Sequence, residues 1–386
     1  MAIFAHNAQM CKMVIKSGKI YVFSALIVVC SLVIAGCERV IEATTQDEIV
    51  FEPSLHVEVK GIDITGSMTN FGVFATLEEY GQDFAESENL QTFMDNVRVE
   101  KTDGVWSTNP KYYWPIIGGK KLSFFGYAPH NRDNPELHLA EDWSPSNKKI
   151  TITYAPSPDP MKHLDLCVAQ AVLDRDNIAH RGELIVLDFE HTLSWVTFGA
   201  NYEEEGSVLP SGCYMRIDEL TLSNLVGENI LVFDSSEDDF FNWGTSAQMS
   251  GSVCYTLKVG SALANVKLVK KEGATPSYSN IVSPGGNLFL LPQRINPQGG
   301  TGLKTMISVK FSFVRETDDV VIAQFEVQKD LPAWSENTEW IPGRKIVYNF
   351  TVDLNNISLV NISPVTIEDW VDSENKHNGG QGVQIK

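Results

Sequence analysis

Apolar and polar residues alternate along much of the chain, and a period of two is typical of β-strands that bury one face. The clearest case lies between Lys345 and Leu354, where the apolar positions are Ile346, Tyr348, Phe350, Val352 and Leu354. The same alternation recurs at residues 307–313 and 321–327, with the polar stretch 315–319 between them. These two segments are predicted to form a hairpin.

Further strands are expected wherever short alternating runs are bounded by turn residues. They are predicted at residues 55–59, 71–75, 97–99, 122–127, 150–154, 184–189, 191–198, 215–222, 230–233 and 266–269. No segment shows a sustained apolar period of three to four residues, apart from a weak one between Phe84 and Met94. Many short strands separated by Gly, Pro, Asn and Asp favour sheets that cover one another. The pattern therefore predicts a mainly β protein built from antiparallel β-sandwiches.

The first 36 residues have the layout of a lipoprotein signal peptide. Lys12, Lys16 and Lys19 precede an apolar run that ends at Ile34-Ala35-Gly36-Cys37. Small residues before Cys37 admit a signal peptidase, and the Cys37 thiol is the nucleophile that takes a diacylglycerol. The run is shorter than the roughly 20 residues of a spanning helix, which weighs against the alternative of a transmembrane anchor. An ordinary cleaved signal is the other alternative, and Met13 is an alternative start.

About 350 residues remain after this leader, which exceeds the usual size of one domain and predicts two. Residues 37–50 are expected to be a tether, 51–202 an N-terminal β-sandwich and 210–386 a C-terminal one. The best candidate for a linker is the polar, glycine-bearing stretch Asn201 to Gly212, which includes Glu203-Glu204-Glu205-Gly206.

The formal net charge of −19 makes a nucleic-acid partner unexpected, because no basic face compensates for it.

After the leader only Cys167, Cys213 and Cys254 remain besides Cys37, and their spacing predicts neither a disulfide framework nor a zinc or redox motif. The sequence therefore predicts no cofactor and no metal.

Catalytic motifs are missing from the sequence: it has no G-x-S-x-G, H-E-x-x-H or phosphate-loop pattern. His191 is interpreted as a hydrogen-bonded structural histidine, since no Asp, Ser or Cys accompanies it in the sequence as a catalytic group. Tyr112, Tyr113, Trp114 and Phe124 are interpreted as core or cross-strand aromatics rather than a sugar-binding surface. Paired glycosidase carboxylates need only spatial proximity and stay open. We expect a protein that is not an enzyme.

Several blocks, in this order, resemble those of the fimbrillins, the subunits of type V pili and related two-domain surface lipoproteins. The first blocks are Trp106, Tyr112-Tyr113-Trp114-Pro115, Leu122 to Pro129, and Leu187 to Val196, which is similar to the F-x-H-x-L segment of the family. The second half contributes Phe289 to Gln293, Trp340, Pro342, Gly343, Lys345, Tyr348, Phe350, Val365 and Trp370. The resemblance covers nearly all of the mature chain and implies transthyretin-like sandwiches.

This resemblance implies a surface lipoprotein that is held in the outer membrane through Cys37. It also implies that a protease removes the leading strand and that a strand of another pilus subunit takes its place. The predicted leading strand is Leu55 to Lys60. Polymerising members are commonly cut after an arginine, whereas here the equivalent place holds Lys60-Gly61. Cleavage at the other nearby basic residue, Arg39, would separate the protein from its lipid tether without removing the leading strand. Shaft, anchor and tip roles therefore stay open, as do host or bacterial surface ligands.

Two other classes of function fit the same leader and sheets. A glycan-binding surface lipoprotein is the first alternative and needs an exposed platform of aromatic side chains. An exported hydrolase is the second and needs convergent polar residues in a cleft.

Overall fold

The computed structural model describes residues 47–55, 68–78, 82–131, 137–139, 148–234, 240–244, 250–258, 266–273, 276–281, 288–295, 304–332 and 339–369. Residues 48–386 form one compact unit. Within the described ranges, regular structure is β-strand apart from 3-10 conformation at Asn131 and at Pro160–Lys162. The Asp159 side chain caps the turn at Pro160–Lys162 by accepting from the Met161 amide at 3.1 Å. The predicted mainly β fold is confirmed. No helix among the described residues is long and apolar enough to cross a membrane.

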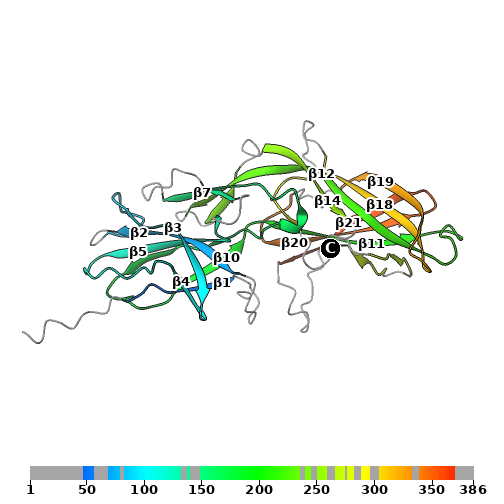
Figure 1. Ribbon diagram of the computed structural model, residues 1–386. Coiled ribbons are helices and arrows are strands. Elements are labelled where there is room, and N and C mark those ends of the chain that lie inside the picture. Colours follow the sequence, from blue (N-terminus) through cyan, green and yellow to red (C-terminus); the bar gives the residue numbers. More distant parts are fainter. Residues whose placement is uncertain are drawn as a thin grey trace, which may run out of the picture. The chain divides into compact units, whose positions relative to one another are not determined.

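The first sheet contains strands from the first half of the chain, and Figure 1 shows β1, β4 and β10 in one group. Its members are β1 (Phe51–Leu55), β2 (Asn70–Glu78), β3 (Gln91–Thr102), β4 (Val105–Thr108), β5 (Lys121–Ala128), β8 (Cys167–Ala169), β9 (Val172–Asp176) and β10 (Ile185–His191). Their order is β2-β3-β4-β1-β10-β8-β5-β9. Because β2 also pairs with β5, the path from β2 through β1 to β5 closes on itself.

A second sheet is organised around one long strand, β12. Its members are β6 (Leu137–Leu139), β7 (Lys149–Tyr154), β12 (Cys213–Asp234), β13 (Phe241–Trp243), β14 (Ser250–Lys258), β18 (Met306–Arg315) and β19 (Val321–Asp330). Strands β18 and β19 pair antiparallel, with Val309 opposite Val327 and Phe311 opposite Phe325. The predicted hairpin is confirmed.

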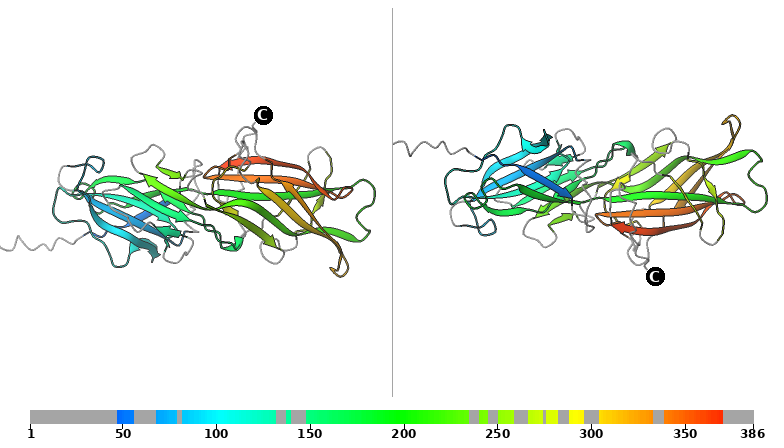
Figure 2. Two further views of the ribbon diagram at one scale, coloured as in Figure 1. Left: turned by 90° about the horizontal axis from the view of Figure 1, so that it is seen from above. Right: turned by 90° about the horizontal axis from the view of Figure 1, so that it is seen from below.

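The third sheet has the order β15-β11-β20-β21, with β16 and β17 also paired to β11. Its members are β11 (Ser194–Glu203), β15 (Val269–Lys270), β16 (Ser279–Asn280), β17 (Leu288–Leu290), β20 (Arg344–Asp353) and β21 (Ser358–Asp369). Strand β11 runs parallel to β20, from Ser194 opposite Arg344 to Glu203 opposite Asp353. In Figure 2 the orange and red strands β20 and β21 lie beside the green β11.

The two strands predicted at residues 215–222 and 230–233 are in fact one strand, β12. The register of β12 against β14 shifts between Leu222 and Leu225, and Asn224 between them has a positive φ of 63°. Such a bulge interrupts the alternation without ending the strand. The sequence pattern breaks there, and the prediction of two strands was therefore wrong.

Strand pairing crosses the predicted boundary between the two domains. Strand β11, placed before that boundary, pairs with β20, and β7 pairs with the second half of β12 through contacts such as Ile152 opposite Leu231. Asn201 belongs to β11 and is fully buried, so only the residues after Glu203 form the connection to β12. The division into two domains remains a prediction.

Buried side chains of the described residues form three clusters. One contains Phe198, Leu222, Phe311 and Phe350 among others, and joins β11, β12, β18 and β20. A second lies inside the first sheet and contains Phe51, Phe71, Trp106, Trp114, Phe124 and Phe189. A third joins β5, β7 and β12 through Phe125, Ile152 and Phe233. Aromatic rings dominate the largest buried side chains, which explains the aromatic blocks of the sequence.

Candidate functional site

Strand β1 is held chiefly by one neighbour. It runs parallel to β10 in register from Phe51 opposite Ile185 to Leu55 opposite Phe189. On its other side it meets β4 only where Phe51 lies opposite Trp106. The Ile185 amide donates to the Val50 carbonyl at 2.9 Å, and the Ser54 hydroxyl donates to the Asp188 carboxylate at 2.9 Å. Strand β1 thus completes a sheet whose other described strands come from later in the chain.

The side chains of this strand and of its approach enter the core of the first sheet. Phe51 is 2% exposed, and its ring packs edge-on against Phe71 and Phe124, each at a centroid distance of 6.0 Å. Ile49, just before the strand, is fully buried, and its amide donates to the Tyr112 carbonyl at 2.9 Å. Taking β1 away would expose the core and the backbone groups of β10 together.

The residues predicted for lipidation and processing, Cys37, Arg39 and Lys60, lie outside the described residues. The predicted leading strand, Leu55 to Lys60, also lies outside them apart from Leu55, and the strand that the structure describes at this place is β1, Phe51–Leu55. The order of these residues along the chain relates them to β1. Lys60 follows the last residue of β1, Leu55, by five positions, so a cut after Lys60 separates the whole strand from the rest of the chain. A cut after Arg39 leaves β1 joined to it.

The aromatic block at residues 112–124 lies mostly in the core. Trp114 and Phe124 are fully buried, and Tyr112 packs edge-on against Phe93 at a centroid distance of 5.9 Å. Of these aromatics only Tyr113 is exposed, at 37%. The interpretation of Trp114 and Phe124 as core residues is confirmed, and these side chains do not form a sugar-binding platform.

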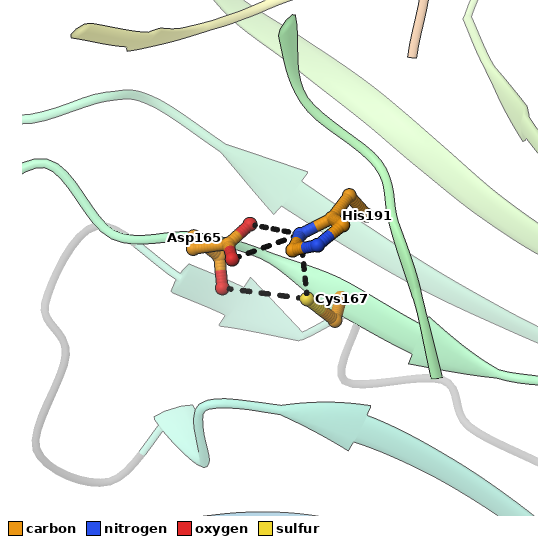
Figure 3. A group of neighbouring side chains, drawn as sticks. All are labelled: Asp165, Cys167 and His191. Atoms are coloured by element: carbon orange, nitrogen blue, oxygen red, sulfur yellow. Dashed lines mark hydrogen bonds and ion pairs between the residues drawn. The ribbon is translucent and has the colours of Figure 1, made fainter. Parts of the chain in front are cut away.

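His191 lies beside a carboxylate and a thiol, as Figure 3 shows. Its Nδ1 is 2.9 Å and 3.0 Å from the two carboxylate oxygens of Asp165 and 3.6 Å from Sγ of Cys167. The prediction of a hydrogen-bonded histidine is confirmed. The statement that no Asp or Cys accompanies it was wrong, because strand pairing brings in residues that lie 24 and 26 positions earlier in the chain.

The sheet itself assembles these three residues. Cys167 begins β8 and His191 ends β10, and the antiparallel register places them directly opposite each other. Asp165 precedes Cys167 by two positions, which is the spacing that puts side chains on the same face of an extended chain. Spacing of this kind, Asp-x-Cys, is visible in the sequence, but only the pairing of β8 with β10 identifies the histidine as its neighbour.

This arrangement does not suit nucleophilic catalysis. In a nucleophile relay the imidazole contacts the nucleophile through one ring nitrogen and the orienting carboxylate through the other. Here Asp165 and Cys167 both lie against the same nitrogen, Nδ1. A thiol sulfur, an imidazole nitrogen and a carboxylate oxygen are instead a set of donors that proteins use to hold zinc.

Comparison with known proteins agrees with this fold. The structure is similar to that of a fimbrial protein from Bacteroides vulgatus ATCC 8482, with a TM-score of 0.60 and 19% identity over 84% of this chain and 99% of that one. Weaker matches are a candidate cell adhesion protein from Bacteroides ovatus ATCC 8483 (TM-score 0.45, 15% identity, 86% and 99% covered) and the fimbrial anchor protein Mfa2 from Porphyromonas gingivalis (TM-score 0.34, 9% identity, 84% and 98% covered).

No protein with a curated description matches the sequence. The model of the fimbrillin-like family matches residues 59–370, which is most of the chain. This match includes the aromatic blocks and the segment around His191 on which the resemblance to fimbrillins was based. The chain belongs to the fimbrillin-like family.

Proposed function

We propose that this chain is a fimbrial subunit or fimbrillin-like adhesin that is exported as a lipoprotein and assembles with other pilus subunits by β-strand exchange. The observation that carries the proposal is the place of β1. It is the first strand among the described residues, it pairs in parallel with β10, and it buries Phe51 in the core of the first sheet.

Loss of β1 would leave a groove suited to another strand. The backbone groups of β10 that now pair with residues 51–55 would lose their partners, and buried backbone groups without partners are costly. An extended segment of another subunit can supply the same hydrogen bonds, and its alternate side chains can fill the space of Phe51. The groove would therefore favour capture of a strand from another chain.

Export as a lipoprotein places the start of the chain at the outer membrane, through a diacylglycerol on Cys37. The chain from Cys37 to Asp47 then joins this lipid to the compact unit that begins at Glu48. The acidic composition suits an exterior that faces the medium. Host or bacterial surface molecules are the ligands expected of an adhesin in this position.

The test uses the mature chain, Glu38 to Lys386, treated with a trypsin-like protease under native conditions. Light scattering follows particle size, and N-terminal sequencing identifies the cut. We expect cleavage after Lys60 and growth into fibres. Lys60→Ala should prevent both, whereas Arg39→Ala should prevent neither.

A disulfide that fastens β1 to β10 separates strand release from cleavage. Ser54 and Asp188 lie opposite each other in the register and are already hydrogen-bonded, so S54C/D188C can be crosslinked, in a chain that also carries C213S/C254S. The oxidised protein should be cut after Lys60 without polymerising, and reduction should restore growth.

Two results would overturn assembly by strand exchange. One is a chain that is cut after Lys60, releases residues 38–60 and stays monomeric at high concentration. The other is growth of the oxidised S54C/D188C protein at the rate of the reduced one. A stable uncut monomer would instead favour an anchor, a tip or a glycan-binding role.

A further inference from the structure

We propose that Asp165, Cys167 and His191 form a zinc site at the end of the β8–β10 pair. The proposal rests on this cluster alone and is independent of the function in fibre assembly. The ligands would be a carboxylate oxygen of Asp165, Sγ of Cys167 and Nδ1 of His191, with water as the fourth.

The three donor atoms already converge, since all lie within 4.8 Å of one another. A tetrahedral zinc ion with bonds of about 2.3 Å to sulfur and about 2.0 Å to nitrogen separates these two donors by roughly 3.5 Å. The distance from Sγ of Cys167 to Nδ1 of His191 is 3.6 Å. The carboxylate lies closer to Nδ1, at 2.9 Å, because a proton now joins them in a hydrogen bond.

Only a small adjustment of Asp165 is therefore needed. In a tetrahedral site the carboxylate oxygen and Nδ1 would lie roughly 3.4 Å apart. Asp165 lies outside the strands, between the 3-10 turn and β8, so its side chain can withdraw without breaking the ladder. Entry of zinc would move the imidazole proton from Nδ1 to Nε2.

The backbone around the cluster is held from several sides. Cys167 and His191 are direct cross-strand partners, and the Thr192 amide and hydroxyl both donate to the Leu166 carbonyl, at 3.0 Å and 2.6 Å. The Trp243 indole donates to the Thr192 carbonyl at 2.6 Å. These contacts fix the positions from which two of the three ligands project, and such preorganisation favours metal affinity.

Charge and exposure also suit a zinc ion. The ion carries two positive charges, and a thiolate and a carboxylate neutralise them while the imidazole stays neutral, so the filled site has no net charge. This matters because Cys167 is 4% and His191 6% exposed. The Asp165 side chain is 30% exposed, which provides a path for the ion and room for a water ligand. Binding releases the Cys167 thiol proton.

A filled site would join the start of β8 to the end of β10. Strand β10 is also the parallel partner of the leading strand β1. Zinc would therefore stiffen the strand along which the leading strand lies.

The experiment titrates cobalt, a spectroscopic substitute for zinc, into the mature chain Glu38 to Lys386, which contains every described residue. The parent protein carries C213S/C254S, so that Cys167 is the one thiol present. We expect one cobalt per chain, a thiolate-to-cobalt charge-transfer band in the near ultraviolet, and loss of that band when zinc displaces the cobalt. Zinc should also raise the thermal midpoint of unfolding.

The added variants are C167S, H191Q and D165N, with H180Q as the matched control, because His180 lies near the Asp176 carbonyl and away from the cluster. C167S should abolish the band, and each ligand variant should weaken zinc binding by at least about 10-fold, which is the smallest loss expected when only a supporting partner of a ligand is removed. H180Q should bind like the parent. Circular dichroism identifies variants that fail to fold, and D165N, altered outside the strands, is the least disruptive of them.

Two results would overturn the site. One is a folded parent protein that binds no cobalt or zinc at micromolar concentration, which would leave the trio as a hydrogen-bonded group only. The other is a C167S protein that binds zinc with the affinity of the parent.

Discussion

The ring of Phe51, on the first described strand, lies edge-on against the ring of Phe124 at a centroid distance of 6.0 Å. The two residues come from β1 and β5, and neither strand is the hydrogen-bonded neighbour of the other. The contact crosses the interior of the first sheet, so the leading strand contributes to the core as well as to the ladder. The strand that the proposed cut after Lys60 would remove is thus part of what stabilises the uncut protein.

Phe51→Ala should lower the free energy of unfolding by about 3–5 kcal/mol, because it removes a buried aromatic ring and leaves a cavity. Glu52→Ala, one position along the same strand, changes an exposed side chain and should alter it by no more than about 0.5 kcal/mol. Urea denaturation of the mature chain measures both. Equal midpoints for the two variants would show that β1 is not part of the cooperatively folded core.

Glu78, buried at the end of β2, should make stability depend on pH. Burial raises its pKa from 4.5 to about 7, against the hydrogen bonds from Thr76 and Ser123, and the Asp174 charge raises it further. Since the folded pKa is the higher one, this stabilisation is present in full below about pH 4.5 and is lost as pH rises through about 7. Glu78→Gln should remove that loss, with Glu100→Gln, altered at an exposed side chain, as control. Urea midpoints from pH 4.5 to 8 test this, and parallel curves for Glu78→Gln and the parent would contradict it.

His163 should make the free energy of unfolding change with pH in the opposite sense to Glu78, over much of the same pH range. Burial lowers its pKa from 6.5 to about 4, although its Nε2 lies 2.9 Å from the Ser157 carbonyl and Asp159 is nearby. Because the folded pKa is the lower one, its contribution is present above about pH 6.5 and is lost as pH falls toward 4. His163→Gln should therefore reduce the loss of stability in acid. Nuclear magnetic resonance titration of the imidazole provides a direct check, and a midpoint near 6.5 would refute the shift.

Cys37→Ser should abolish attachment of lipid and release the protein from the membrane, because the Cys37 thiol is the group proposed to take the diacylglycerol. Cys30→Ser, within the apolar run of the predicted leader, is the matched control and should leave attachment unchanged. Labelling cells with a radioactive fatty acid, followed by membrane fractionation, measures both effects. Incorporation of label into the Cys37→Ser protein would refute the lipoprotein assignment.

Alternation predicted many of the strands because it is a local property. The run from Lys345 to Leu354 corresponds to β20, and residues 307–313 and 321–327 fall within the paired strands β18 and β19. Each of these strands buries one face, so the pattern can be seen without knowing what covers it. For the same reason the leader and Cys37 could be predicted from a short stretch of sequence, while their processing, like that at Arg39 and Lys60, remains to be measured.

Departures from the predictions occur where pairing over long distances decides the outcome. Residues 191–198 look like one strand, yet β10 ends at His191 and β11 begins at Ser194 in another sheet. Continuity of β12 past its bulge depends on β18 along one half and β7 along the other. A local pattern shows neither where a strand changes sheets nor whether it continues past a bulge, because the pairing of a strand depends on the packing of the whole chain.

The β character, the predicted lipoprotein leader and the resemblance to a family can all be read locally, because short periods and motifs encode each of them. The folded chain alone shows that β1 lies parallel to β10, with Ser54 hydrogen-bonded to Asp188 across 134 positions, and that Asp165 and Cys167 meet His191. Both relationships depend on strand register, which is set by how all the sheets bury their apolar faces together.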